Sequence, residues 1–365
     1  MSKKVEKIDL IPPNFSNDNF LGYKAGLRPC RKSGVNLSEQ IIRGKRILHN
    51  YGHGAGGVSL APGYANIQVN KFFQRYSSFK NLNHIGIIGS GYMGLFTALE
   101  LIKLGYKVTI YADQFIKDDG LCSLETDKNH PTASQIAGGY WLPYGYEYNI
   151  NEETQRVHDQ ACNFSWNFYK SSIEKKVYNG VRFMKVYHLD GIEYIKNSVP
   201  KEIFNDFKEV QVSWGNGKYY DAFTFTTILI EGDIFLKELF NECRKQGVNF
   251  VNKHLNDEGE VTELPHDYIF NCAGIHSGKL FNDKNVYPIK GQLAVFRHTK
   301  GVDYYLSAPG PNGSRVTVYP HSTGTACGIT HERDVWDQRP TLSICSVVAK
   351  NAQEFFKDKT AQPRL

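Results

Sequence analysis

The sequence lacks the features that would place it in several special classes of protein. No apolar run approaches the roughly 18 residues that a membrane-spanning helix requires, so we expect no membrane partner. The seven cysteines are scattered, odd in number and never spaced C-x-x-C, which disfavours disulfides and zinc knuckles and favours a cytoplasmic protein. Neither G-x-S-x-G nor H-E-x-x-H occurs. No hydrolase triad and no metal site are therefore predicted.

A block of charge of one sign is also missing. The net charge of +6 is spread over 365 residues, whereas a nucleic-acid groove usually shows as a cluster of basic residues. We therefore expect no nucleic-acid partner, and the excess positive charge would suit a small anionic substrate. At about 150 residues per domain, the length predicts two domains.

What the sequence does contain is a glycine motif of the nucleotide-binding kind. HIGIIGSGYMG places Gly89, Gly91 and Gly94 between an apolar strand and a helix. The first glycine permits a tight turn, the second lets a pyrophosphate approach the backbone, and the third lets helix and strand pack closely. Asp113 ends the next apolar strand, where an acid can bind a ribose hydroxyl. The motif predicts a dinucleotide and leaves NAD and FAD open.

Two other stretches precede this motif. HNYGHGAGGV contains a run of small residues before an apolar segment, so its bare backbone could bring N–H groups against a flat ring. We expect His49 and His53, beside these glycines, to bond the backbone rather than to act as bases. Arg28, in GLRPC, could hold a carboxylate by two parallel bonds, although a solvated loop arginine is the simpler interpretation of that residue alone.

Elsewhere the chain alternates between two patterns. Aromatic and β-branched runs predict an antiparallel sheet, whereas apolar strands joined to amphipathic helices predict a parallel one. One helix is expected from Tyr64 to Phe79. The patterns predict two interleaved domains between terminal segments. The division is a dinucleotide-binding domain of residues 26–180 plus 231–290, a substrate domain of residues 181–230 plus 291–340, and irregular or helical ends at residues 1–25 and 341–365.

Together these segments resemble the D-amino acid oxidase family of FAD-dependent oxidoreductases. TASQIAGGYWLPY, DYIFNCAGIHSGKL and PIKGQLAVF follow the glycine motif in the family's order, but GLRPCR and HNYGHGAGG, which lie near the C-terminus in that family, come first here. The chain thus resembles a circular permutant of the D-amino acid oxidase fold, an α/β protein in which a Rossmann-like FAD-binding domain is interleaved with an antiparallel-sheet substrate domain. Because chain termini often lie close together, such a rearrangement is permissible. The helix after Tyr64 should then lead directly into the parallel sheet, and Leu365 should end near residues 1–25.

The resemblance implies oxidative deamination of an amino acid, in particular a D-amino acid, to a 2-oxo acid and ammonia. Hydride would pass to N5 of FAD, and O2 or another acceptor would reoxidise the flavin. Arg28 would clamp the substrate carboxylate, and the amine would face the backbone near Ala55. The residues implied to contact FAD are Gly54, Gly56, Gly57, Val58, Ser59, Gly89, Gly91, Tyr92, Met93, Gly94, Asp113, Thr132, Ser134, Gly138, Gly139, Tyr140, Ala273 and Gly274.

The sequence departs from the family at the substrate. Thr317 stands where the family has a carboxylate-binding tyrosine, and Tyr319, two residues later on the same face of a strand, would replace it. Tyr304 or Tyr305 would form the lid tyrosine. Ala55 replaces a glycine whose carbonyl meets the substrate amine.

These departures leave other functions open. One is an oxidase of glycine, sarcosine or another secondary amine, and the pocket near Tyr140, Trp141, Arg315 and Tyr319 would discriminate it. Another is a flavin-binding protein without catalysis. An NAD-dependent reductase would leave HNYGHGAGG and TASQIAGGYWLPY without a purpose.

Overall fold

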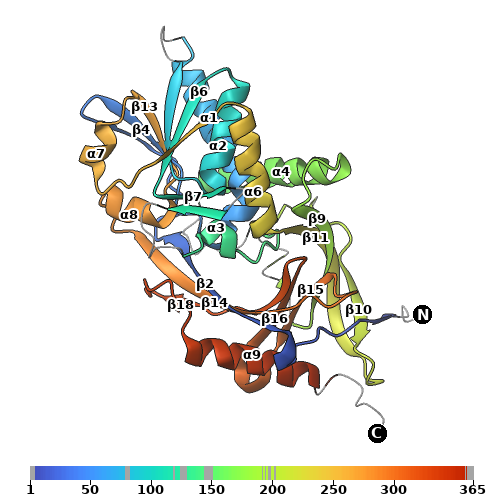
Figure 1. The fold of residues 1–365 in the computed structure, drawn as a ribbon. Coiled ribbons are helices and arrows are strands. Elements are labelled where there is room, and N and C mark those ends of the chain that lie inside the picture. Colours follow the sequence, from blue (N-terminus) through green and yellow to red (C-terminus); the bar gives the residue numbers. More distant parts are fainter. Residues whose placement is uncertain are drawn as a thin grey trace.

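Two sheets, one above the other, organise the protein (Figure 1). A computed structural model describes residues 5–78, 83–117, 120–123, 130–143, 151–190, 192, 193, 195, 199, 200, 203–357 and 359. In this part of the chain, no helix is both long enough and apolar enough to cross a membrane.

The six-stranded sheet is parallel except at one edge. Its strands, in spatial order, are β12 (Asn249–Asn252), β6 (Lys107–Ala112), β5 (His84–Ile88), β13 (Tyr268–Asn271), β4 (Lys45–His49) and β3 (Glu39–Ile42). Only β3 runs antiparallel to its neighbour. The inner strands β5 and β13 are apolar and buried, as expected for a parallel sheet covered on both faces.

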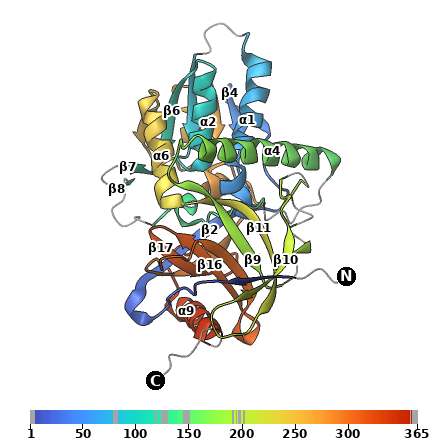
Figure 2. The same ribbon diagram turned by 90° about the vertical axis from the view of Figure 1, so that its right-hand side faces the viewer.

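Helices cover both faces of this sheet. On one face lie α1 (Gly57–Tyr76), α2 (Tyr92–Lys103), α4 (Glu152–Glu174) and α6 (Gly232–Lys245), which share the main hydrophobic core with β5 and β6 (Figure 2). On the other face, the short helices α7 (Glu258–Thr262) and α8 (Ser277–Leu280) enclose a smaller core. The helices α1 and α4 approach closely at Gly63, where a Cβ would lie 2.2 Å from the Ala161 carbonyl oxygen.

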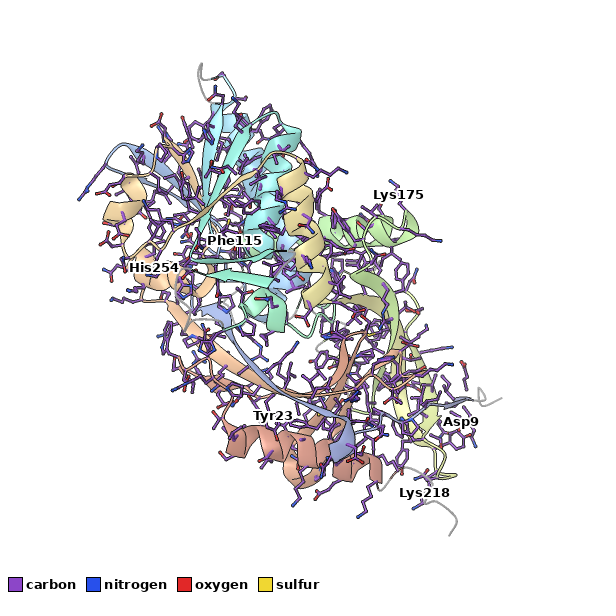
Figure 3. All side chains as sticks on the ribbon, viewed as in Figure 1. Asp9, Tyr23, Phe115, Lys175, Lys218 and His254 are labelled. Atoms are coloured by element: carbon purple, nitrogen blue, oxygen red, sulfur yellow. The ribbon has the colours of Figure 1, made fainter. Side chains whose placement is uncertain are left out.

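The ten-stranded sheet is mostly antiparallel and lies below the first. Its strands, in spatial order, are β1 (Glu6–Asp9), β10 (Lys208–Ser213), β11 (Tyr220–Ile230), β9 (Val181–His188), β15 (Tyr304–Pro309), β16 (Arg315–His321), β17 (Gly324–Gly328), β14 (Val286–Phe296) and β18 (Glu332–Arg333), with β2 (Phe20–Arg31) paired to β14. The helix α9 (Leu342–Lys357) packs beneath it on a second core. A hairpin of β7 (Gln114–Lys117) and β8 (Gly120–Ser123), the short helix α3 (Ala133–Ile136) and the 3-10 turns at Asn17–Asn19, Gly54–Gly56, Gly274–His276 and Pro311–Gly313 complete the described elements. Figure 3 shows the side chains that fill the layers around both sheets. His254 and Phe115 lie with the upper sheet, and Tyr23 lies near α9.

The predicted fold class, a parallel sheet combined with an antiparallel one, is confirmed, but the N-terminal segment is not irregular. Residues 6–9 form β1, and β2 starts at Phe20 and pairs with β14 along its length. In this pairing Pro29 lies opposite Pro288, so the two residues without a backbone N–H share one rung of the ladder. Because β14 starts at Val286 and β2 ends at Arg31, the domain limits drawn at residues 26 and 290 fall inside these two strands.

The connections expected of a permuted chain can be followed in part. The helix α1 begins at Gly57, earlier than predicted, and ends at Tyr76, while Phe79 lies outside the described residues. The next described element after α1 is β5, a strand of the six-stranded sheet. Leu365 also lies outside the described residues. Near the end of α9, however, Gln353 Nε2 donates to the Phe15 carbonyl at 2.7 Å.

Candidate functional site

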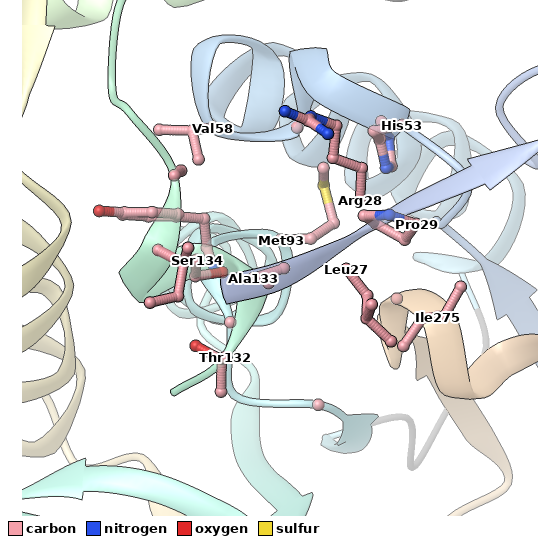
Figure 4. A pocket seen from close by; sticks show the side chains of 18 of the residues that line it. Leu27, Arg28, Pro29, His53, Val58, Met93, Thr132, Ala133, Ser134 and Ile275 are labelled. Carbon is pink, nitrogen blue, oxygen red and sulfur yellow. The ribbon is translucent and has the colours of Figure 1, made fainter. Parts of the chain in front are cut away.

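A cavity of about 840 Å³ lies between the two sheets, at the carboxyl ends of the strands β4, β5, β6 and β13. Ligands of open α/β sheets bind at this edge. Figure 4 shows β2 crossing this cavity with Leu27, Arg28 and Pro29, and Thr132, Ala133 and Ser134 around α3.

Glycines of the turn from β5 to α2 are closely packed against their neighbours. Gly89 has φ +101°, and a Cβ there would lie 2.4 Å from the Cys272 carbonyl oxygen. At Gly94 a Cβ would lie 1.9 Å from the Gly89 carbonyl oxygen, and at Gly91 one would lie 2.8 Å from Ser134 Oγ. The start of α2 therefore lies against the cavity, and the backbone N of Tyr92 donates there to Ser134 Oγ at 3.3 Å. A helix N-terminus in this position suits a bound diphosphate.

The second glycine-rich loop forms another such approach at the start of α1. Gly54 has φ +55°, and Ala55, in the 3-10 turn before the helix, is exposed to the cavity. Within the described structure, Asn50 Nδ2 and Oδ1 and His53 Nε2 are buried without a hydrogen-bond partner, and both residues line the cavity. Burial lowers the pKa of His53 to about 3, so it is neutral. Unsatisfied polar atoms of this kind fit a polar ligand.

The far end of the cavity is polar and closed by two strands. Asp113 follows β6, and its Oδ2 lies 3.3 Å from His254 Nδ1. Asn252, at the end of the neighbouring strand β12, donates through Nδ2 to the Asp113 carbonyl at 2.9 Å. Lys253 also lines this end. The arrangement suits the ribose and adenine of a dinucleotide.

The segment from Thr132 to Leu142 crosses from one sheet to the other. It is fixed at α3, where the backbone N of Thr132 donates to Gln135 Oε1 at 2.8 Å, and at its end, where the N of Leu142 donates to Ser59 Oγ at 3.2 Å. Gly139, with φ +68°, packs so closely on β11 that a Cβ would lie 1.8 Å from the Ile230 carbonyl oxygen.

Large side chains from β15 and β16 form the wall opposite the glycine loops. Tyr305, Ser307, Thr317 and Tyr319 share one face of these paired strands and line the cavity. The rings of Tyr305 and Tyr319 lie 5.1 Å apart, and Tyr140 stacks on Tyr305 at 4.3 Å. Burial raises the pKa of Tyr319, which keeps the phenol protonated. The wall therefore offers aromatic surface and neutral hydroxyl groups.

Arg28 brings a positive charge to this wall from β2. Its Nη1 donates to the carbonyls of Ile289 and Thr330, each at 3.3 Å. The guanidinium lies over Gly291 of β14, where a Cβ would come within 2.7 Å of Nη2. In Figure 4 the side chain rises from β2 towards the start of α1, on the same side as His53. It is thus held in a fixed place beside the glycine loop.

Most of the residues predicted for the site meet at this one cavity. Those that line it are Arg28, Gly54, Ala55, Gly57, Val58, Ser59, Gly89, Gly91, Tyr92, Met93, Asp113, Thr132, Ser134, Gly138, Gly139, Tyr140, Ala273, Gly274 and Tyr319. Gly56 and Gly94 do not line it. Gly94 packs behind Gly89, the role its spacing predicts.

Three other residues face elsewhere. Tyr304 donates to the Ile11 carbonyl at 2.8 Å in the lower core, so Tyr305 is the tyrosine that faces the cavity. Trp141 is fully buried and does not line the pocket. His49 lies 3.2 Å from Gln40 Oε1 through Nε2 and accepts from Asn271 at 3.1 Å, and burial lowers its pKa to about 4.

Several lining residues escaped the sequence analysis. They are Asn50, Ser90, Lys253, His254, His276, Lys279, Ser307 and His331. Asn50 and Ser90 lie inside recognised motifs, so their position alone could have nominated them. His276 and Lys279 also lie inside a recognised segment, DYIFNCAGIHSGKL. Lys253, His254, Ser307 and His331 lie in or after strands of the two sheets, outside the motifs that the sequence analysis quoted.

Comparison with known proteins decides the family. The model of the family described as FAD dependent oxidoreductase matches residues 84–364. The chain belongs to this family. It is therefore an FAD-dependent oxidoreductase, an amino acid oxidase in its broad class, and the glycine turn, the helix start and the unsatisfied polar atoms around the cavity fit FAD as its cofactor.

Curated relatives agree with this assignment. The chain is 27% identical over 286 residues to the D-amino-acid oxidase of Fusarium vanettenii, covering 74% of this chain and 77% of that protein. It is 24% identical over 298 residues to the D-amino acid oxidase of Dugesia ryukyuensis, covering 74% and 79%. It is also 24% identical over 269 residues to the human D-aspartate oxidase, covering 70% and 71%.

Solved structures with a similar fold are more distant. The L-alpha-glycerophosphate oxidase of Mycoplasma pneumoniae with FAD bound superposes with a TM-score of 0.48 at 14% identity, covering 73% of this chain and 78% of that one. An iminodiacetate oxidase from Chelativorans gives a TM-score of 0.46 at 15% identity, covering 74% and 80%.

Proposed function

We propose that the protein oxidises a D-amino acid to the corresponding 2-oxo acid and ammonia. The observation that carries this proposal is Arg28, held over Gly291 beside the start of α1, where a bound flavin ring and a substrate would meet. A guanidinium in such a place binds a carboxylate through two parallel hydrogen bonds. The family's relatives named as D-amino-acid oxidases support the class of substrate.

Each group has a limited task in this reaction. Arg28 binds the carboxylate, Tyr319 donates its hydroxyl to it, and the backbone near Ala55 accepts from the neutral amine. FAD, bound by the glycine turns, supplies the acceptor for the two electrons that leave the substrate Cα–H bond. The amino acid becomes an imino acid, which water hydrolyses to the 2-oxo acid and ammonia.

The proposed reaction assigns no general base to the described side chains of the substrate wall. Among the described residues of the substrate wall, the groups are the guanidiniums of Arg28 and Arg315 and neutral hydroxyls, and burial lowers the pKa of His53 to about 3, which keeps it neutral. The protein therefore contributes orientation and exclusion of water. O2 is the proposed acceptor that completes the cycle.

We also propose that the chain is a circular permutant of the family fold. The family match begins at residue 84, yet Arg28 and the glycine loop at residues 49–59, which precede it, line the same cavity as the matched residues. The succession of α1 and β5 along the chain and the packing of α9 on residues near Phe15 support this order. In a permutant of this kind, the pairing of β2 with β14 would hold together the two interleaved domains that the sequence predicts.

Anaerobic titration tests the proposed reaction. The holoprotein should be yellow. D-amino acids should bleach its visible absorbance, whereas L-amino acids should not. Bleaching by L-amino acids alone, or by glycine and sarcosine alone, would reject the proposed substrate. Failure of every amine to bleach a fully loaded flavin would leave a binding protein without catalysis.

The variant Arg28→Ala tests the carboxylate clamp. We expect it to lower kcat/KM by about 2–5 kcal/mol in transition-state free energy, as truncation of one partner of a desolvated charge pair does. FAD should stay bound, since Arg28 lies at the substrate wall. Unchanged kinetics would eliminate the clamp.

A further inference from the structure

A second guanidinium borders the substrate wall of the cavity. Arg315 is the first residue of β16 and alternates with Thr317 and Tyr319 on the face that lines the cavity. Its Nη1 donates to Ser307 Oγ at 2.6 Å, and Ser307 is itself a wall residue on the paired strand β15. Arg315 therefore occupies the same surface as Tyr319, two strand positions beyond Thr317.

Arg315 is held in place from behind. Its Nη2 pairs with Oδ2 of Asp190, which follows β9 and does not line the cavity. The strand pairing of β9 with β15 fixes this carboxylate beside Ser307. A guanidinium anchored by a carboxylate on one side and a hydroxyl on another loses little further side-chain entropy when it binds a ligand.

The charge of the cavity favours an anion at this wall. Of the described residues that line the cavity, the one acid is Asp113, at the ribose end and paired there with His254. The substrate wall carries two guanidinium groups, those of Arg28 and Arg315. Burial raises the pKa of the Tyr319 hydroxyl, and both of these charges act to lower it. Arg28 would take the α-carboxylate of a substrate, and Arg315, which Asp190 pairs from behind through Nη2, presents its Nη1 side to the wall at Ser307.

Arg315 also remains reachable. Its side chain is 47% exposed despite the ion pair. It borders both the cavity and an outer hollow of about 400 Å³ beside α9. A group on the substrate that extends away from the flavin can thus meet it without displacing Asp190.

We propose that the substrate is an acidic amino acid, whose side-chain carboxylate is bound by Arg315 while Arg28 holds its α-carboxylate. The inference rests on the proposed function, because it extends the same substrate along the same wall. A cationic side chain would face two guanidinium groups, since Asp190 stands behind Arg315. An apolar side chain would leave Arg315 with its ion pair but without a ligand.

Paired substrates of equal shape test the proposal on the holoenzyme. D-glutamate and D-glutamine differ in one charge, so the ratio of their kcat/KM values reports on a charged partner alone. We expect the protein to prefer D-glutamate by about tenfold or more, and Arg315→Gln to lower that ratio by a similar factor. Arg315→Lys should keep part of the preference. Arg333→Gln, on β18 and against the Tyr287 ring, is the matched control and should leave the ratio unchanged.

A binding measurement separates this inference from the proposed function. Glutarate and valerate have the same carbon chain and cannot be deaminated, so their inhibition constants or calorimetric affinities need no turnover. Glutarate should bind at least about tenfold more tightly than valerate, and Arg315→Gln should remove the difference. If D-glutamine and other neutral D-amino acids are oxidised but neither pair favours the acid, the inference fails and the proposed function stands. If no D-amino acid is oxidised, the proposed function fails, and the glutarate difference still decides the role of Arg315.

Discussion

The cofactor side and the substrate side of the cavity use glycine for opposite purposes. On the cofactor side, Gly89 and Gly91 keep side chains out of the turn so that a ligand can approach the backbone. On the substrate side, glycine makes room for another side chain of the protein. Gly291 lies under the guanidinium of Arg28, and at Gly138 a Cβ would lie 2.4 Å from the Tyr319 ring.

Under the proposed function, this difference separates cofactor binding from choice of substrate. The cofactor side depends on main-chain geometry, so substitutions there disturb the turn itself. The substrate side depends on where large side chains rest, so a small change under one of them moves the group that touches the substrate. Damage to the first side should abolish flavin binding, whereas damage to the second should spare it.

The largest effect is expected for Gly89→Ala. The new Cβ would meet the Cys272 carbonyl at 2.4 Å at a φ of +101°, and backbone strain plus overpacking cost roughly 2–6 kcal/mol together. The turn must shift to relieve this contact, so FAD should bind at least about a hundredfold more weakly, a loss of about 2.7 kcal/mol. Fluorescence titration of the apoprotein with FAD measures it.

Gly105 provides a matched control. It lies two residues after α2, has a φ of +86° and has open space around a Cβ. Gly105→Ala therefore carries only the left-handed strain, about 1 kcal/mol in stability, and should leave FAD affinity unchanged. Equal FAD affinity in both variants would show that the close approach at Gly89 is not needed.

Gly291→Ala is the corresponding test on the substrate side. Its Cβ would meet Arg28 Nη2 at 2.7 Å, so the guanidinium should move and kcat/KM should fall by about ten- to a hundredfold. Flavin content should be unchanged. Because the effect acts through Arg28, it should disappear in an Arg28→Ala background. An equal loss in both backgrounds would assign Gly291 a merely structural role.

The two sides also differ in what the sequence could predict. The cofactor side could be predicted because its determinants are local, a strand, a glycine turn and a helix within a short stretch from His84. Arg28 was predicted as a site residue only through the family resemblance. Its neighbours belong to β14, far along the chain, so the local sequence does not reveal them. The strand β2 was missed because its glycines and Pro29 have low strand propensity, and pairing with β14 overrides it.

The register of strand pairing decides which other side chains face the substrate side of the cavity. Tyr304 and Tyr305 are equivalent by sequence, and only the pairing of β15 with β9 and β16 turns Tyr305 towards the cavity. His254 could not be predicted either. It reaches Asp113 because β12 lies beside β6, a neighbour more than a hundred residues away in sequence.

A moderate, pH-dependent effect should come from Asp283, which attaches the segment before residue 84 to the part matched by the family. Arg31 Nε donates to Asp283 Oδ2 at 2.7 Å, and the Tyr51 hydroxyl donates to the same oxygen at 2.8 Å. Burial raises the pKa of this carboxyl, but the bonds from Arg31, Asn285 and Tyr51 outweigh it and lower the pKa from 3.8 to about 2.

A carboxyl group whose pKa is lower in the folded than in the unfolded protein stabilises the fold at pH values above its unfolded pKa. This stabilisation is lost as the pH falls through the folded pKa. The contribution of Asp283 should therefore be complete above pH 4 and lost towards pH 2, and is at most about 2 kcal/mol. Urea unfolding of the protein and of Asp283→Asn should differ by this amount at pH 5 and converge near pH 2. A constant difference across that range would contradict the ionised clamp.

The smallest effect is expected for the hydrogen bond that joins α4 to the start of α1. Pro62 in α1 has no N–H to donate to the Val58 carbonyl, and the Tyr169 hydroxyl of α4 donates to that oxygen instead, at 2.7 Å. Tyr169→Phe should leave a buried carbonyl unsatisfied and lower the free energy of unfolding by about 1–2 kcal/mol. Tyr219→Phe removes an exposed hydroxyl bonded to Asp9 and should leave stability nearly unchanged. Val58 lines the cavity, so thermal unfolding should be measured with and without FAD. The loss of stability in Tyr169→Phe should appear in both states. A loss confined to the FAD-loaded protein would mean that the hydrogen bond supports the ligand rather than the helix.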